Sequence, residues 1–117
     1  MLLAFSVAPS GQPAHPAGDS AAPASGASAD ASVHDAVAAA VKIVRDSGLP
    51  NHTDSMFTTI EGEWDEVFAV VKQATEAVGR FGSRVSLVIK ADIRPGYSGE
   101  LTGKVERLEN AITNVPG

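Results

Sequence analysis

Two stretches of the chain alternate between apolar residues and polar or small ones, which is the pattern of a β-strand with one buried face. Over residues 2–8, the bulky side chains Leu3, Phe5 and Val7 fall on one face and smaller ones on the other. Residues 84–93 repeat the alternation, with four apolar residues on one face: Val85, Leu87, Ile89 and Ala91. We therefore predict two long strands at the two ends of a sheet-forming domain.

Three other segments repeat apolar residues every three or four positions, which is the spacing of one helix face. The first predicted helix is capped by Ser32 and stops at Gly48. The second runs over residues 65–81, with acidic residues at its start and Gly82 as the expected left-handed cap. The third covers residues 101–112, near the end of the chain.

Two short segments between the first two helices predict the remaining strands. Residues 51–54 and 56–60 would be joined by a tight turn around Ser55. The order β-α-β-β-α-β-α places two βαβ-type crossovers around a central hairpin, which is the split βαβ, or ferredoxin-like, arrangement. We expect an α+β fold in which helices cover one face of a four-stranded antiparallel sheet, followed by a C-terminal helix. The other face would be partly apolar and would meet a second subunit or a ligand; its residues include Ala4, Ser6, Ser86, Val88 and Lys90.

Residues 9–31 differ in composition from the rest of the chain. Of these 23 residues, 19 are Ala, Pro, Ser or Gly. Such a segment buries too little apolar surface to offset its ordering entropy, about 1–2 kcal/mol per residue. We predict that Pro9 ends the first strand and that the segment is a disordered loop inserted into a single domain spanning residues 1–117.

Composition excludes several functional classes. The chain has 117 residues, a formal net charge of −5 and no cysteine, and its basic residues are scattered. A nucleic-acid partner is therefore not expected, and neither are disulfides or thiolate metal sites. No segment is long and apolar enough for a membrane span, and the apolar residues 2–8 lack the basic flank of a signal peptide. The default expectation is a cytoplasmic protein.

The sequence gives no support for catalysis or for a bound metal. Its three histidines, His15, His34 and His52, have no acidic residue at ligand spacing on a shared helix face. Gly-x-Ser-x-Gly elbows, phosphate-binding glycine loops and dinucleotide fingerprints do not occur. We expect neither an enzyme nor a resident cofactor.

Several motifs together resemble a known family. They are the FSVAPSG segment at 5–11, the helix stop at Gly48, and above all the TTIEG strand end at 58–62, which is followed by an acidic, valine-containing helix. This combination resembles the thiamine-binding domain family, the YkoF-like proteins of ferredoxin-like fold, over the whole chain except residues 9–31. The resemblance implies a cytoplasmic homo-oligomer, a dimer or a tetramer, that binds thiamine or its aminopyrimidine half without chemistry.

A thiamine site needs a carboxylate, hydroxyl groups and an apolar wall, because the ligand joins a cationic thiazolium ring to a flat aminopyrimidine. The candidate ligand-binding residues are Ser6, Thr58, Thr59 and Glu61 for the polar half, with Phe57 or Trp64 as the wall. Each has a simpler explanation. The threonines are good strand formers, Glu61 favours the dipole of the helix that follows, and Trp64 suits a hydrophobic staple or an interface.

Three hypotheses follow for the function. The first is non-catalytic binding of thiamine or a related pyrimidine by a homo-oligomer. The second is a structural or regulatory oligomerisation module without a small-molecule ligand. The third is a sensing subunit of a larger enzyme.

Overall fold

The computed structural model describes residues 1–12 and 29–116 of the chain, with the side chains of the second segment described from residue 33 onward. Residues 13–28, most of the predicted disordered loop, lie outside the described residues. The elements in chain order are β1 (Leu2–Ser10), α1 (Ala29–Asp46), β2 (Asn51–Thr53), β3 (Thr58–Glu61), α2 (Trp64–Val78), the 3₁₀ turn η1 (Gly79–Phe81), β4 (Arg84–Asp92) and α3 (Glu100–Thr113).

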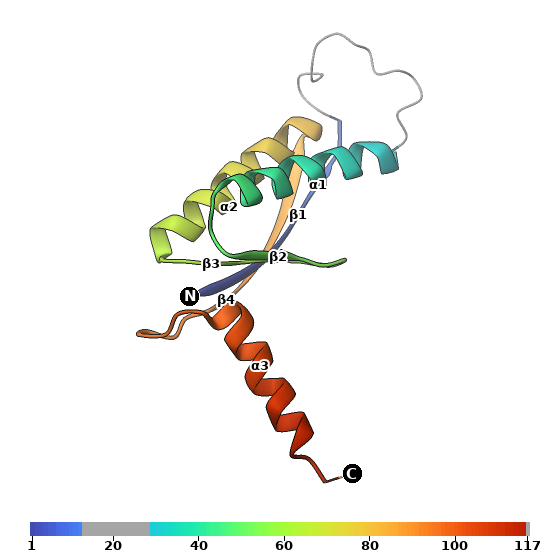
Figure 1. The fold of residues 1–117 in the computed structure, drawn as a ribbon. Coiled ribbons are helices and arrows are strands. Elements are labelled where there is room, and N and C mark those ends of the chain that lie inside the picture. The colour runs from blue at the N-terminus through green and yellow to red at the C-terminus, as the bar shows by residue number, and fades with distance from the viewer. Residues whose placement is uncertain (13–28, 117) are drawn as a thin grey trace.

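The four strands form one antiparallel sheet in the order β2-β3-β1-β4. Helices α1 and α2 pack together on one face, whereas α3 lies on the other side and projects away from the body (Figure 1). The predicted ferredoxin-like α+β fold is confirmed. Within the described part of the chain, no helix combines the length and hydropathy needed to cross a membrane.

The core lies between the sheet and the helix pair α1–α2. Leu3, Phe5 and Val7 are buried on β1, as their alternation predicts, and Ile60 of β3 joins them. The predicted stripe of α2 is buried as well; it consists of Val67, Val71, Ala74 and Val78. In the stripe predicted for α1, Ala40 and Val44 are buried and Val41 is half-buried, but Val33 and Val37 are exposed. Ala36, which the prediction did not include, is buried.

Strand β1 is longer than predicted, because it continues through Pro9 to Ser10. From Ser6 onward, the register pairs β1 with β4 alone among the described strands. A proline is tolerated where one side of a strand is unpaired, since the missing N–H need not remove a ladder bond. The expectation that Pro9 ends the strand was therefore wrong.

Two predicted helix ends also need correction. Helix α1 begins at Ala29, so the expected cap, Ser32, lies inside the helix; alanines favour this extension by their high helix propensity. Gly82 is not a left-handed cap, because its φ of −166° is extended. It is required by close approach instead, since a Cβ there would lie 2.5 Å from the carbonyl oxygen of Ser10. Gly48, with a φ of +80°, is in the left-handed conformation expected at a helix end.

The β2–β3 hairpin turns later than the sequence suggests. Met56 and Phe57 were predicted in the third strand, but they lie in the turn that precedes β3. The carboxylate Oδ1 of Asp54 accepts the backbone N–H of Met56 at 2.8 Å and that of Phe57 at 2.9 Å. An Asp side chain that bonds its own backbone two and three residues on competes with strand pairing, and this fixes the turn.

Candidate functional site

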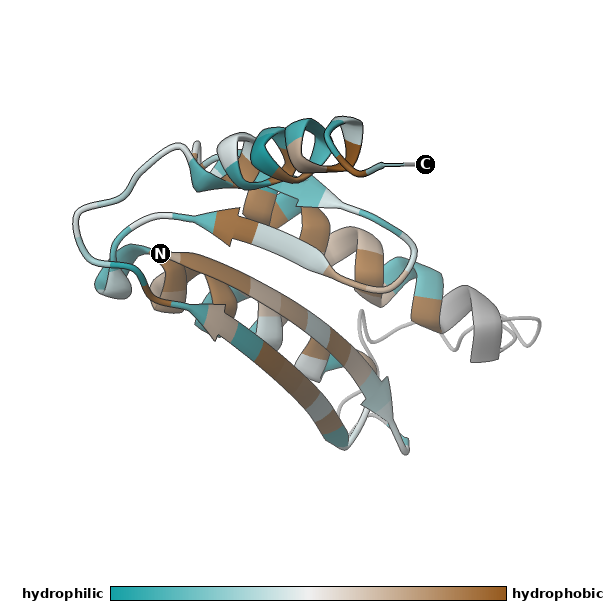
Figure 2. Ribbon diagram, turned by 90° about the horizontal axis from the view of Figure 1, so that it is seen from below, coloured by the Kyte–Doolittle hydropathy of each residue, from teal (hydrophilic) through white to brown (hydrophobic). Residues whose placement is uncertain are grey.

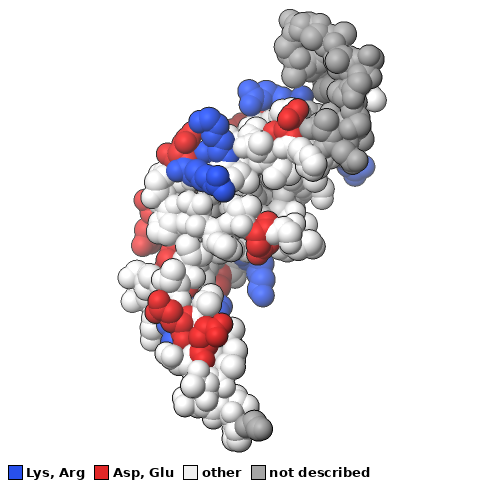
Figure 3. Space-filling view, turned by 45° about the vertical axis from the view of Figure 1, so that its right-hand side comes forward, with Lys and Arg blue, Asp and Glu red and all other residues white. Residues whose placement is uncertain are grey.

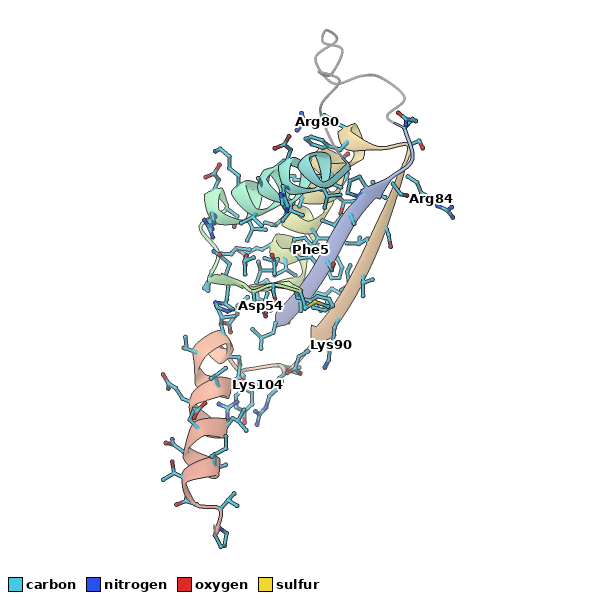
Figure 4. All side chains as sticks on the ribbon, turned by 90° about the vertical axis from the view of Figure 1, so that its right-hand side faces the viewer. Phe5, Asp54, Arg80, Arg84, Lys90 and Lys104 are labelled. Carbon is cyan, nitrogen blue, oxygen red and sulfur yellow. The ribbon has the colours of Figure 1, made fainter. Side chains whose placement is uncertain are left out.

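A cavity of about 210 Å³ opens beside β1 at the point where β3 begins. Phe5 is the last β1 residue paired with β3, opposite Thr58, and no other described strand pairs with β1 on that side beyond it. Helix α1 and the hairpin turn close the cavity. Figure 4 shows Phe5 on β1 and Asp54 at the hairpin. We call this space the edge cavity; the residues that line it include Phe5, Val37, Asp54, Met56, Phe57 and Thr58.

The edge cavity combines apolar walls with a small polar group of side chains. Thr58 is buried, and its hydroxyl lies 3.1 Å from that of Thr53. Backbone hydrogen bonds from Phe57 and Met56, with a smaller contribution from His52, hold the pKa of Asp54 below its usual range. Asp54 is therefore anionic at neutral pH, and its Oδ2 takes no part in the turn hydrogen bonds.

Three of the six predicted site residues line the edge cavity: Ser6, Phe57 and Thr58. Ser6 alternates with the buried Phe5 and Val7, so its side chain belongs to the opposite sheet face and its backbone borders the cavity. Asp54 was missed as a site residue, although its position before Ser55-Met56-Phe57 is a turn signal that could have identified it.

A second cavity, of about 610 Å³, lies on the other side of the sheet against α3. Thr59 lines it, together with Leu2, His52, Leu101 and Val105. Since side chains alternate along β3, Thr58 and Thr59 face opposite sides of the sheet. The two threonines therefore cannot act on one ligand held in either cavity.

Glu61 caps helix α3, which the sequence did not suggest. Its carboxylate accepts the backbone N–H of Glu100 at 2.8 Å and that of Leu101 at 3.2 Å, and the residue is 8% exposed. Helix α2, whose dipole Glu61 was expected to favour, begins instead at its N-cap Glu63, whose N–H is accepted by Glu66 at 3.0 Å. Glu61 lines neither of the two cavities.

Trp64, the alternative apolar wall, lies at the first position of α2 and also lines neither cavity. Its ring stacks on Phe68 with centroids 5.2 Å apart and an interplanar angle of 12°. Trp64 remains 53% exposed. This geometry places Trp64 on the surface of α2, stacked on Phe68, and away from both cavities.

Comparison with known proteins identifies the family. A model of the family described as "Thiamine-binding protein" matches residues 20–109. The chain belongs to this family. It is 46% identical over 113 residues to the UPF0045 protein Mb1933 of Mycobacterium bovis, covering 96% of this chain and 94% of that protein. It is 36% identical over 84 residues to the UPF0045 protein sll0230 of Synechocystis, covering 71% and 69% of the two chains.

Solved structures share the fold of this chain. A domain of unknown function, DUF77, from Bacillus cereus aligns with a TM-score of 0.67 and 28% identity, covering 91% of this chain and 86% of that one. A proposed thiamine biosynthesis/salvage protein from Thermotoga maritima aligns with a TM-score of 0.63 over 92% and 96% of the two chains. At 21% identity, the latter likeness extends to the fold alone.

Proposed function

We propose that the protein binds thiamine or a related aminopyrimidine in the edge cavity, without catalysing a reaction on it. The observation that carries the proposal is the joint presence of an aromatic residue, a pair of hydroxyl groups of which Thr58 is buried, and an anionic carboxylate around one small space. The family to which the chain belongs is described as thiamine-binding, which supports this choice of ligand.

Each part of such a ligand has a counterpart in the edge cavity. Beyond Phe5, one edge of β1 is paired with no described strand, and its backbone N–H and C=O groups suit the donor and acceptor positions of an aminopyrimidine. Phe57 provides a ring face for stacking or for cation–π contact. Both turn hydrogen bonds of Asp54 are accepted by Oδ1, so Oδ2 can attract the thiazolium charge.

The choice of carboxylate departs from the sequence-based hypothesis. Glu61 accepts two backbone N–H groups of α3 and would have to release them before it could bind a cation. Both donors would then lose their acceptor, which costs free energy. Asp54 can bind a cation with its turn intact. We therefore assign the charge-recognition role to Asp54, and the role of Glu61 to holding α3.

Calorimetric titration with thiamine tests the proposal. Asp54→Asn retains an oxygen acceptor for the turn but removes the charge, so we expect affinity to fall roughly tenfold or more. Asp65→Asn removes an equal charge from the start of α2 and should leave affinity unchanged. If millimolar thiamine gives the wild-type protein neither heat nor a thermal shift, the proposal is wrong. If Glu61→Gln abolishes binding while Asp54→Asn does not, the carboxylate has been misassigned.

The proposal includes self-association as a dimer or tetramer in the cytoplasm, as expected from the resemblance. A second candidate function, an oligomerisation module without its own small-molecule ligand, is favoured by exposed apolar residues on β4 and α3. Light scattering on the pure protein separates the possibilities when it is combined with the titration. Assembly without thiamine binding would support the module, and binding by a monomer would support ligand capture alone.

A further inference from the structure

The edge cavity is built from parts of the chain that contain no basic side chain. Among the described residues that line it, Asp54 is the only one with an ionisable side chain. All the lining residues belong to two stretches of the sequence, 1–41 and 46–71, and neither stretch contains a lysine or an arginine. A positive charge could therefore reach the cavity only from another part of the fold.

The nine lysines and arginines of the chain lie elsewhere, and none of them lines the edge cavity. Lys42 directly follows the lining residue Val41, but it donates to Asp46 at 2.7 Å. Figure 3 shows basic groups next to acidic ones on the body of the molecule. Lys104 and Arg107 belong to α3, which lies across the sheet from α1 (Figure 2). Within the described part of the chain, the charge of the edge cavity is thus negative and uncompensated by a lining residue.

The backbone of the hairpin turn and of α1 does not make an anion site at the cavity either. Besides Arg and Lys, proteins hold phosphate with the N–H groups of a turn or of the first turn of a helix. In the hairpin turn, the N–H groups of Met56 and Phe57 already donate to Asp54 Oδ1, at 2.8 and 2.9 Å. Helix α1 begins at Ala29 and contributes Val37 and later residues, which lie beyond its first two turns. These groups are therefore occupied or too far along the helix to bind a phosphate.

We propose that the edge cavity holds its ligand only while the hydroxyl group of the ligand is free, and that phosphorylation of this group releases the ligand. The inference rests on the proposed binding of thiamine, whose thiazolium ring carries a hydroxyethyl chain. Asp54 attracts the ring, so a phosphate on this chain would lie close to the same carboxylate. A phosphate monoester adds a charge of about −1.5 to −2 at pH 7, which turns a cationic ligand into a net anion. Attraction to Asp54 is then replaced by repulsion.

The inference places the protein before a phosphoryl-transfer reaction that another protein catalyses. In a reaction of this class, the hydroxyl oxygen of the ligand bonds to the terminal phosphorus of a nucleoside triphosphate. The bond between that phosphorus and the nucleoside diphosphate breaks, and the hydroxyl proton passes to a base or to solvent. Because the edge cavity does not take back the ester, the transfer withdraws ligand from the protein and leaves the product unbound.

Calorimetric titration of the full chain with thiamine, its monophosphate and its diphosphate, without divalent cations, tests the inference. We expect the dissociation constant of the monophosphate to exceed that of thiamine at least about tenfold, and that of the diphosphate to be higher still. The acetic ester of thiamine controls for size, because it extends the same oxygen and keeps the positive charge. It should bind like thiamine. If it binds as weakly as the monophosphate, size and not charge excludes the ester, and the inference is wrong.

Two lysine variants locate the effect. Ser55 is exposed, lines the cavity and adjoins Asp54, so Ser55→Lys adds a cation where the phosphate would lie. The ratio of the monophosphate and thiamine dissociation constants should fall about tenfold. Gln73→Lys adds the same charge to the exposed side of α2 and should leave the ratio unchanged. Equal effects of the two lysines would show that net charge, rather than the edge cavity, discriminates between the ligands.

The charge of Asp54 itself gives a further test. Asp54→Asn weakens thiamine binding under the proposed function, but it should also bring the dissociation constants of thiamine and its monophosphate closer together, since attraction and repulsion are lost at once. If the wild-type protein binds the monophosphate as tightly as thiamine, the inference is wrong and thiamine binding stands. If it binds neither compound, the proposed function fails and the inference fails with it.

Discussion

The two faces of the sheet differ in how much of their apolar surface the chain itself buries. On the helix-covered side, Leu3, Ile60, Val67 and Val78 are all fully buried by α1 and α2. On the other side, α3 contacts the sheet through its first turn and leaves its remaining apolar residues exposed. The first side is packed like a protein core. The second side exposes apolar residues, as interaction surfaces do. Mutations should therefore affect folding on one side and association on the other.

The largest expected effect comes from truncating a core residue. Leu3→Ala removes a fully buried side chain between β1 and the helix layer, so we expect the free energy of unfolding to fall by about 2–5 kcal/mol. Leu108→Ala removes the same atoms from a side chain that is 56% exposed. In the dilute, monomeric protein this second change should cost less than about 0.5 kcal/mol. Urea denaturation measures both, and equal losses would contradict the distinction between the two sides.

A pair of glycine substitutions compares the same two regions through the backbone. Gly82→Ala places a Cβ 2.5 Å from the carbonyl oxygen of Ser10, so β1 or the turn into β4 must shift. We expect a loss of about 1–3 kcal/mol in the free energy of unfolding. Gly103→Ala lies in α3, where the nearest atom to the new Cβ is Arg107 Nη1 at 3.6 Å. The substitution should stabilise the helical state of α3 by up to about 1 kcal/mol. Circular dichroism measures the expected gain in helicity, and thermal unfolding measures the gain in stability. If Gly82→Ala is neutral, the close approach is not required.

Periodicity predicted the helix-covered side well and the other side poorly. The alternation of Leu3, Phe5 and Val7 and the stripe of α2 both depend on local spacing, which is readable in one sequence. The cap that Glu61 provides for α3 joins residues 39 positions apart, and no local pattern encodes it. The site was divided for a related reason. Asp54 moved the turn, which placed Phe57 outside β3. Thr58 and Thr59 face opposite sides of the sheet because consecutive side chains alternate along a strand.

Removing the long-range cap should loosen α3 without unfolding the body. Glu61→Ala leaves two N–H groups of α3 without their carboxylate, and we expect a loss of about 0.5–2 kcal/mol confined largely to this helix. Hydrogen exchange of the α3 amides should accelerate, while exchange in α2 stays unchanged. The control Glu106→Ala, which removes an exposed carboxylate from α3, should leave both unaffected. Uniform acceleration across the protein would mean that α3 belongs to the same cooperative unit as the core.

The smallest expected effect is the response of α3 to acid. Lys104 donates to Asp92 at 2.7 Å and lowers the pKa of this carboxyl, and Arg107 does the same for the pKa of Glu100. A lowered pKa in the folded state contributes stability that is fully present above the ordinary aspartate value of about 4 and is lost as the pH falls through the folded value. Protection of the α3 amides should therefore be constant between pH 7 and 5 and decline below about pH 4. The Asp92–Lys104 pair and the Arg107 side chain are about half exposed, so screening keeps the effect small and 0.5 M salt should weaken it further. In Lys104→Met the acid-induced decline should be smaller than in the wild type, and an unchanged decline would show that the Asp92–Lys104 pair does not hold α3 in place.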